Sequence, residues 1–333
     1  MSSLNSLIDR AQSFAPTYSK RHLSNHLPMA LVALHALGAS DEQLEHGFAR
    51  FSQKLEPITQ DSERHPDWTE CRGQREAFTQ VRAQLSHDIS KRGIDAALRA
   101  ALPYLIDGVG GAAFHGLLRT ASATVARHND ELASGLAHWV CSHMPLVPSL
   151  EPNATGETSA SPHKLGLHEW LSEITSSPVP WKSPDGMIAS LMQNCAASES
   201  FQATAARLNA HDGTLRELAN LAIGHYLRSR NFTVLHLVTG SHAMRILLPY
   251  FDAPMAAVHH FAIAFAAGVA ASGIDADAPL LPSNPQHWQA LKVAACNADD
   301  QHVIKLVYAC HEEFLVTGDE RYRSAATLVL DRN

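Results

Sequence analysis

Histidines inside apolar segments are the residues of this chain best suited to chemistry. The sequence holds 21 histidines among 333 residues, and histidine is both the commonest metal ligand and an acid–base group near neutral pH. A polar group buried in an apolar segment costs free energy unless it finds a partner. For each histidine taken singly a backbone carbonyl is the ordinary partner, and a metal ion is the alternative.

Two of these histidines lie in the first third of the chain. His26 belongs to a segment whose apolar residues repeat with helical spacing, and His22 lies four residues before it. This spacing predicts that both occupy one face of a helix. His115 begins another apolar helix directly after Gly110 and Gly111. The small residues around His115 would let another helix, or a ligand, approach closely.

The other histidines of this kind lie in the last third of the chain. His236 and His242 share one apolar segment. Six residues turn a helix by about 600°, so the two point to different sides unless the helix breaks at Gly240. His302 and Lys305 are three residues apart and share a helix face. Helical bundles build metal sites from inward side chains on facing helices, so these histidines together predict a bound metal.

The residue types leave the identity of the metal open. Nitrogen-rich ligation suits zinc, copper, iron or nickel, and the chain has neither an H-E-x-x-H motif nor a cysteine-rich zinc spacing. The Gly-rich stretch 108–111 follows no predicted strand and precedes no Lys-Ser/Thr pair. No nucleotide motif therefore supports NADPH as an electron donor. The G-x-S-x-G motif of serine hydrolases is also absent.

Lys305 is flanked by apolar residues, and two interpretations of it stay open. Its ammonium can reach the surface along its own stem. If it is buried instead, desolvation lowers its pKa by several units. A neutral amine near a metal can take up carbon dioxide and become a carbamate, which would offer an anionic oxygen ligand beside His302.

Charged neighbours of the histidines could complete a site. Arg119 and Arg245 follow His115 and His242 by four and three residues. Either arginine could bind an anionic or phenolate substrate, and a surface position is the alternative. Asp299 or Asp300 could accept a hydrogen bond from a ligating histidine and so fix its tautomer.

Helical periodicity dominates the elements that must position these residues. One helix is predicted from residue 22 to 37, ended by Gly38, and the next opens at Ser40 with a capping-box partner at Gln43. Strand–helix–strand alternation is absent, so the predicted fold is all-α, a multi-helix bundle with a central metal site. The other predicted helical segments are 77–102, 110–142, 186–208, 213–228, 232–249, 254–273, 287–297 and 299–316.

A proline-rich segment interrupts the helices. Residues 143–186 hold seven of the seventeen prolines and predict an extended loop. The chain is expected to form one large helical domain over 1–333, or two helical halves, 1–142 and 187–333, joined by this segment.

Composition bounds the class of protein. Hydrophobic residues make up 45% of the chain, which excludes a disordered class. The formal net charge is −7 and basic residues are scattered, so no nucleic-acid partner is expected. Five cysteines without a C-x-x-C pair predict reduced thiols in a cytoplasmic protein. The most apolar stretch, 255–273, is expected to be a buried core helix rather than a membrane span.

Several segments together resemble the questin oxidase-like family. They keep the family's order and span nearly the whole chain. The matching pieces are 25–31 and 37–39, 111–117 with Arg119, 235–240 with His242 and Ala243, and 300–305.

This resemblance implies a helical oxygenase. Its members act on polycyclic aromatic polyketides of the anthraquinone type, by oxygen insertion or C–C ring cleavage, with a non-haem iron on histidines and a contributing lysine. His242 would contact the substrate or support a ligand, and it could exchange roles with His236. Arg119 is the other candidate catalytic residue. Carried over to this chain, the metal ligands would be His26, His115, His236, His302 and Lys305.

Three hypotheses follow for the activity. The first is an Fe(II)-dependent oxygenase whose partners are a small aromatic substrate and O₂. The second places zinc in the same histidine cage and predicts hydrolysis by an activated water. The third is a non-enzymatic helical protein that binds a small molecule, with structural histidines. A homodimer is compatible with the long apolar helices under all three.

Overall fold

The computed structural model describes residues 3–59, 67–148, 163–176 and 185–331, and these are mostly helical. Two short strands, β1 (Thr17–Tyr18) and β2 (Leu23–Ser24), pair antiparallel, with Thr17 opposite Ser24. The first half of the chain contains α1 (Ser3–Ala11), α2 (Leu27–Leu37), α3 (Asp41–Ser52), α4 (Phe78–Arg92), α5 (Ile94–Ala101), α6 (His115–Ala126) and α7 (Asn129–Cys141). The second half contains α8 (Leu167–Thr175), α9 (Ile188–Ala196), α10 (Glu199–Ala205), α11 (Thr214–Ser229), α12 (Phe232–Leu247), α13 (Pro254–Ser272), α14 (Trp288–Cys296), α15 (Gln301–Thr317) and α16 (Glu320–Leu330).

Local sequence signals fix several helix ends. Gly38 has φ +90° and ends α2 in the left-handed conformation that glycine adopts without strain. The Ser40 hydroxyl accepts a hydrogen bond from the Gln43 backbone N–H, and the Gln43 side-chain oxygen accepts one from the Ser40 backbone N–H, so the predicted capping box is confirmed. Asp300 caps α15 by accepting a hydrogen bond from the His302 backbone N–H.

Several predicted helices have different bounds in the structure. The segment 77–102 is divided into α4 and α5, and 186–208 into α9 and α10. The helix predicted to start at His22 begins at Leu27 instead, and His22 lies in the turn before β2. The expectation that His22 and His26 share a helix face is therefore wrong. Pro28 in the first turn of α2 gives the physical reason, because proline suits a helix start and not its interior. The segment predicted as helical over 110–142 is divided into a short 3₁₀ turn, η5 (Gly111–Phe114), followed by α6 and α7.

The structure describes only part of the proline-rich segment 143–186. Residues 149–162 and 177–184 lie outside the described residues, so an extended loop over 143–186 stays a prediction there. The part between them contradicts the expectation, because 167–175 form α8. Trp170 of this helix is fully buried and donates a hydrogen bond to the Thr204 carbonyl at 2.9 Å.

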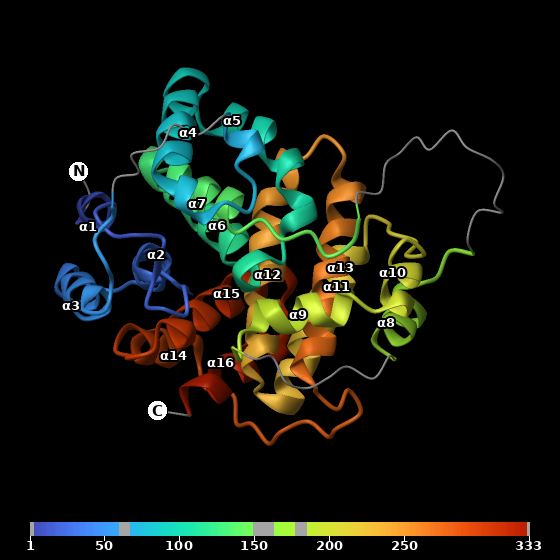
Figure 1. Cartoon of the computed structure of the whole chain (residues 1–333). Coiled ribbons are helices and arrows are strands. Elements are labelled where there is room, and N and C mark those ends of the chain that lie inside the picture. The colour runs from blue at the N-terminus through green and yellow to red at the C-terminus, as the bar shows by residue number, and fades with distance from the viewer. Residues whose placement is uncertain (1–2, 60–66, 149–162, 177–184, 332–333) are drawn as a thin grey trace.

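Helix α12 lies in the middle of the molecule and packs against α6, α11, α13 and α15. The first helices and the last ones lie side by side, with α2 in contact with α14 and α15 (Figure 1). Helices on either side of the proline-rich segment therefore interleave. Whether they form one domain or two halves stays a prediction.

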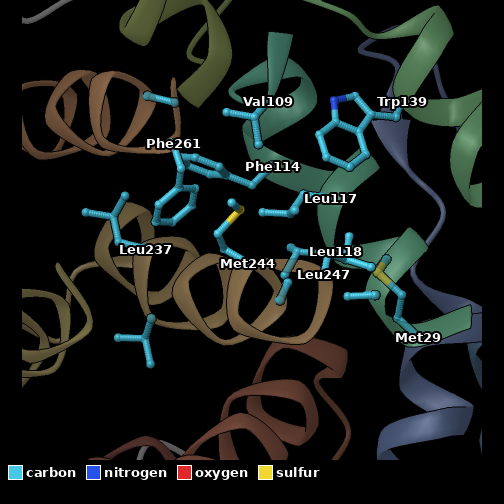
Figure 2. Close-up of a cluster of buried hydrophobic side chains, with 14 of the residues drawn as sticks. Met29, Val109, Phe114, Leu117, Leu118, Trp139, Leu237, Met244, Leu247 and Phe261 are labelled. Atoms are coloured by element: carbon cyan, nitrogen blue, oxygen red, sulfur yellow. The ribbon is translucent and has the colours of Figure 1, made fainter. Parts of the chain in front are cut away.

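The core beneath the site is built from large apolar side chains. Phe114 and Leu117 face Met244 of α12, and Phe261 of α13 closes the cluster (Figure 2). The rings of Phe114 and Phe261 lie 6.0 Å apart, and both residues are fully buried. Burial of such side chains stabilises the fold by roughly 1.5–3 kcal/mol each. The start of α6 is thereby held against α12, the helix that carries His236.

Helix α13 is long and apolar enough to cross a membrane by length and composition, and 56% of its most apolar window is buried within the protein. It packs against α9, α11 and α12.

Candidate metal centre

Four histidine rings meet where the N-terminal ends of four helices converge. His26 precedes α2, His115 is the first residue of α6, His236 lies in the second turn of α12, and His302 is the second residue of α15. The ring centroid of His26 lies 4.5 Å from that of His115 and 4.6 Å from that of His302. The His236 ring lies 5.2 Å from His115 and 5.5 Å from His302. The structure thus brings together the four histidines that were predicted as ligands.

Each of these imidazoles has an oxygen acceptor at its Nδ1 atom. The acceptors for the first three are backbone carbonyls: Ser24 for His26 at 2.5 Å, Ala112 for His115 at 2.5 Å, and Phe232 for His236 at 2.9 Å. The acceptor for His302 is the Asp300 carboxylate at 3.0 Å. Because an oxygen acceptor fixes the proton on Nδ1, it leaves the Nε2 lone pair available to a metal.

The Nε2 atoms of His26 and His115 are 2.8 Å apart. With both protons on Nδ1, two lone pairs would face each other at this distance and repel. A proton or a metal ion between them removes the repulsion. Adjacent nitrogen ligands at about 2.0–2.1 Å from one ion, at right angles, lie roughly 2.9 Å apart. The separation therefore fits two ligands of one metal.

His302 is the third member of the closest set. One ring nitrogen from each of His26, His115 and His302 lies within 4.8 Å of the other two. His236 contacts two of these rings but is not part of that closest set. The Phe232 ring packs against both His236 and His302, at 4.8 and 4.7 Å.

Burial keeps the histidines neutral. Desolvation lowers the pKa of His26 and His115 well below the ordinary value, and the charge of Lys305 lowers both further. Desolvation likewise lowers the pKa of His236 to about 3. The pKa of His302 falls for the same reason, although its hydrogen bond to Asp300 opposes the shift. Neutral imidazole is the form that ligates a metal.

Lys305 lies one turn beyond His302 on α15 and is 8% exposed, so the interpretation in which it reaches the surface is wrong. Burial lowers its pKa to about 7, and the negative charge of Asp300 opposes this shift. Its charge lowers the pKa of all four histidines.

The backbone before His115 has an unusual conformation. Ala112, Ala113 and Phe114 have φ angles of +47°, +54° and +68°. The left-handed region costs roughly 1–2 kcal/mol for each such residue, and strain of this kind gathers at functional sites. The same turn presents the Ala112 carbonyl to His115. A side chain at Gly111 would lie 1.9 Å from the Ser142 carbonyl oxygen, so only glycine lets this turn meet the end of α7.

His242 points to a different side of α12 from His236, as their spacing predicted, and α12 continues through Gly240. Its Nδ1 lies 2.7 Å from the Glu313 carboxylate, which also accepts a hydrogen bond from Arg245 at 2.7 Å. Burial raises the pKa of Glu313, but these two partners more than offset it, so the net pKa lies below the ordinary value. His242 Nε2 is buried without a partner among the described residues. His242 and Lys305 both line an apolar cavity of about 40 Å³.

Arg119 is placed differently from the expectation. It is 1% exposed, and its Nε and Nη2 atoms bind the Glu131 carboxylate at 2.7 and 2.9 Å. It does not line the cavity that His242 and Lys305 share, nor the two larger cavities among the described residues. The guanidinium joins α6 to α7 rather than facing a ligand, so a catalytic role for Arg119 stays a prediction without structural support.

Some functional groups were not singled out in the sequence. Glu313 lies two turns beyond Lys305 on the same face of α15, and that spacing within an apolar helix was the available signal. His138 stands in the apolar part of α7 and meets the criterion that selected the other histidines. Of the two candidate acidic partners, Asp300 binds His302, whereas Asp299 pairs with Arg50 at the surface.

The family described as Questin oxidase-like matches residues 23–310. The chain belongs to the questin oxidase-like family. This confirms the resemblance, and the matched range contains every histidine of the cluster together with Lys305 and His242. The family name implies an oxidoreductase. A search of curated proteins found no match.

Proposed function

We propose that this questin oxidase-like protein is an oxygenase that holds a non-haem iron on His26, His115, His236 and His302. Its substrate would be an anthraquinone-type aromatic compound, attacked by oxygen insertion or C–C ring cleavage. The observation that carries the proposal is the 2.8 Å approach of the His26 and His115 Nε2 atoms, whose Nδ1 protons are already donated elsewhere. When bound, the iron would supply the activation of O₂ that such a reaction needs.

Lys305 completes the ligand set in this proposal as a carbamate. Its amine, with a pKa lowered to about 7, would combine with carbon dioxide to give N–COO⁻ and release one proton. The centre favours an anion at this position, because four helix N-termini converge on it with their partial positive charge. Among the described residues, Asp300 is the acidic side chain acting on Lys305, and its carboxylate is hydrogen-bonded to His302.

The small cavity that Lys305 and His242 line has a size and lining that favour the binding of small gas molecules. Its 40 Å³ are too few for a three-ring aromatic compound, whose sites have volumes of about 300 Å³ or more. Its lining is largely apolar, with Leu118 and Ile246 among its residues, and apolar cavities admit small apolar molecules. We therefore assign this cavity to O₂ and carbon dioxide, with His242 held in place by Glu313.

Single replacements of the ligands test the proposal. His26→Ala, His115→Ala and His302→Ala should each lose bound metal, because each removes one of three closely spaced nitrogen ligands. Elemental analysis of the purified variants measures this, and His87→Ala, at an exposed position of α4, is the matched control. Full iron occupancy in all three variants would refute the ligand assignment. Zinc in place of iron in the wild type would favour the hydrolase hypothesis.

A further inference from the structure

A second and larger cavity lies beside the strained turn. It encloses about 360 Å³ between the β1–β2 hairpin, the end of α7 and the start of α9. Ala112 lines it, and the carbonyl of Ala112 accepts the hydrogen bond from His115 Nδ1. One residue therefore separates this cavity from the candidate metal centre. Its volume falls within the range of sites for drug-sized ligands.

The charged residues that line this cavity are mostly basic. Lys20, Arg21 and Arg75 contribute three positive charges, and Asp185 is the one acidic side chain in the described lining. The Asp185 carboxylate accepts hydrogen bonds from the Met187 N–H at 2.9 Å and from a serine hydroxyl of α9. A concave surface with this excess of positive charge favours an anionic ligand.

His138 of α7 is among the residues that line this cavity. It is 2% exposed, and neither ring nitrogen makes a hydrogen bond among the described residues. Burial lowers its pKa to about 3, with the charges of Arg119 and Arg75 adding to the shift, so the ring is neutral. A neutral imidazole offers one N–H donor and one acceptor. Buried donors are nearly always satisfied, so a ligand that reaches this ring from the cavity would supply a missing partner.

We propose that this cavity binds the aromatic substrate as an anion, with an ionised oxygen at the His138 N–H and its charge facing Arg75 and Lys20. This inference rests on the proposed function for the nature of the ring system. Beyond the proposed function, it gives the substrate a location in this cavity. It also holds that the protein recognises the charge of the substrate as well as its rings. The ring system then extends past Ala112 toward the histidine cluster.

Calorimetric titration of the full chain as purified tests this inference without turnover. The probe is anthraquinone-2-carboxylate, and the control ligand is 2-(hydroxymethyl)anthraquinone, which has the same rings and no charge. We expect the carboxylate to bind at least about tenfold more tightly, since a charge-assisted hydrogen bond is the stronger kind. This preference should shrink as the salt concentration rises.

Two variants assign the preference to this cavity. Arg75→Gln, at an exposed position, should abolish the preference for the carboxylate, and His138→Phe should weaken carboxylate binding about tenfold. Lys91→Gln, an exposed change at the end of α4, is the control of equal charge and should bind as the wild type does. Arg75→Gln also covers the case in which His138→Phe fails to fold.

Equal binding of the two ligands, or an unchanged preference in Arg75→Gln, would overturn the inference. Because binding is measured without catalysis, this failure differs from failure of the proposed function. If the purified protein contains iron but binds the two ligands equally, only the assignment of this cavity is refuted. If it prefers the carboxylate but contains no iron, only the proposed oxygenase function is refuted.

Discussion

At the residue scale, the four imidazoles differ in the group that accepts their Nδ1 proton. Three of them use backbone carbonyls, which no substitution of a side chain removes. His302 alone uses a carboxylate, and the hydrogen bond from His302 keeps the pKa of Asp300 below the ordinary value. An ionised partner makes an imidazole a better ligand. Asp300 is therefore the side chain through which the metal affinity can be changed without removing a ligand.

Asp300→Asn should lower the affinity for metal by about 10-fold or more, because it replaces the charged acceptor of His302 while asparagine still caps α15. Competition with a chelator of known affinity measures this change. Asp299→Asn is the matched control, since Asp299 pairs with Arg50 away from the cluster. Equal affinities of the two variants would contradict the role given to Asp300.

His138 makes a separate prediction for the pH dependence of stability. Its folded pKa of about 3 lies below the unfolded value of 6.5, so the unfolded chain binds a proton that the folded chain does not. The stability contributed by neutral His138 is present above pH 6.5 and is lost as the pH falls below it. Between pH 7.5 and 5.5 the loss is about 1.4 kcal/mol.

Urea unfolding of the wild type and of His138→Gln at these two pH values measures that loss. The free energy of unfolding of the wild type should fall by about 1.4 kcal/mol more than that of the variant, which has no titrating group at this position. An equal fall in both proteins would show that His138 is not held neutral in the folded chain.

At the element scale, helix positions were predictable and one turn was not. Gly38 and the Ser40–Gln43 pair are local signals, and α2 ends and α3 begins where they indicate, whereas periodicity alone placed the start of α2 too early. The turn at 112–114 has no such signal, because alanine and phenylalanine rarely adopt positive φ. Packing of Phe114 in the core and the contact of Gly111 with α7 impose it, and both come from residues distant in sequence.

The strain in this turn predicts opposite effects of two substitutions at Ala112. Ala112→Gly should leave the free energy of unfolding unchanged or raise it by up to about 1 kcal/mol, since glycine adopts positive φ without strain. Ala112→Val should lower it by about 1–3 kcal/mol, because a branched side chain fits that region poorly. Urea unfolding measures both.

An exposed alanine inside a regular helix gives the control for these two variants. Ala96→Gly in α5 should lower the free energy of unfolding by about 1 kcal/mol, the usual cost of glycine in a helix. A similar loss for Ala112→Gly would show that Ala112 is not strained.

At the scale of the whole molecule, the candidate ligands come from helices far apart in the chain. His26 and His302 are brought together because α2 packs on α15, and His115 meets His236 because α6 packs on α12. The sequence indicated that His26, His115, His236 and His242 were buried, since apolar context is local, but it missed His138 and wrongly included His22. It did not indicate Glu131 or Glu313, because their partners Arg119 and His242 lie on other helices.

A metal shared by four helices would also stabilise their packing, since a ligand that binds only the folded state raises its stability. The most direct test of this account is elemental analysis of wild-type protein, purified without added metal and without a histidine tag, followed by thermal unfolding with and without a chelator. We predict about one iron per chain and a lower melting temperature after chelation. No bound metal, with an unchanged melting temperature after chelation and after addition of ferrous ion, would contradict the metal centre.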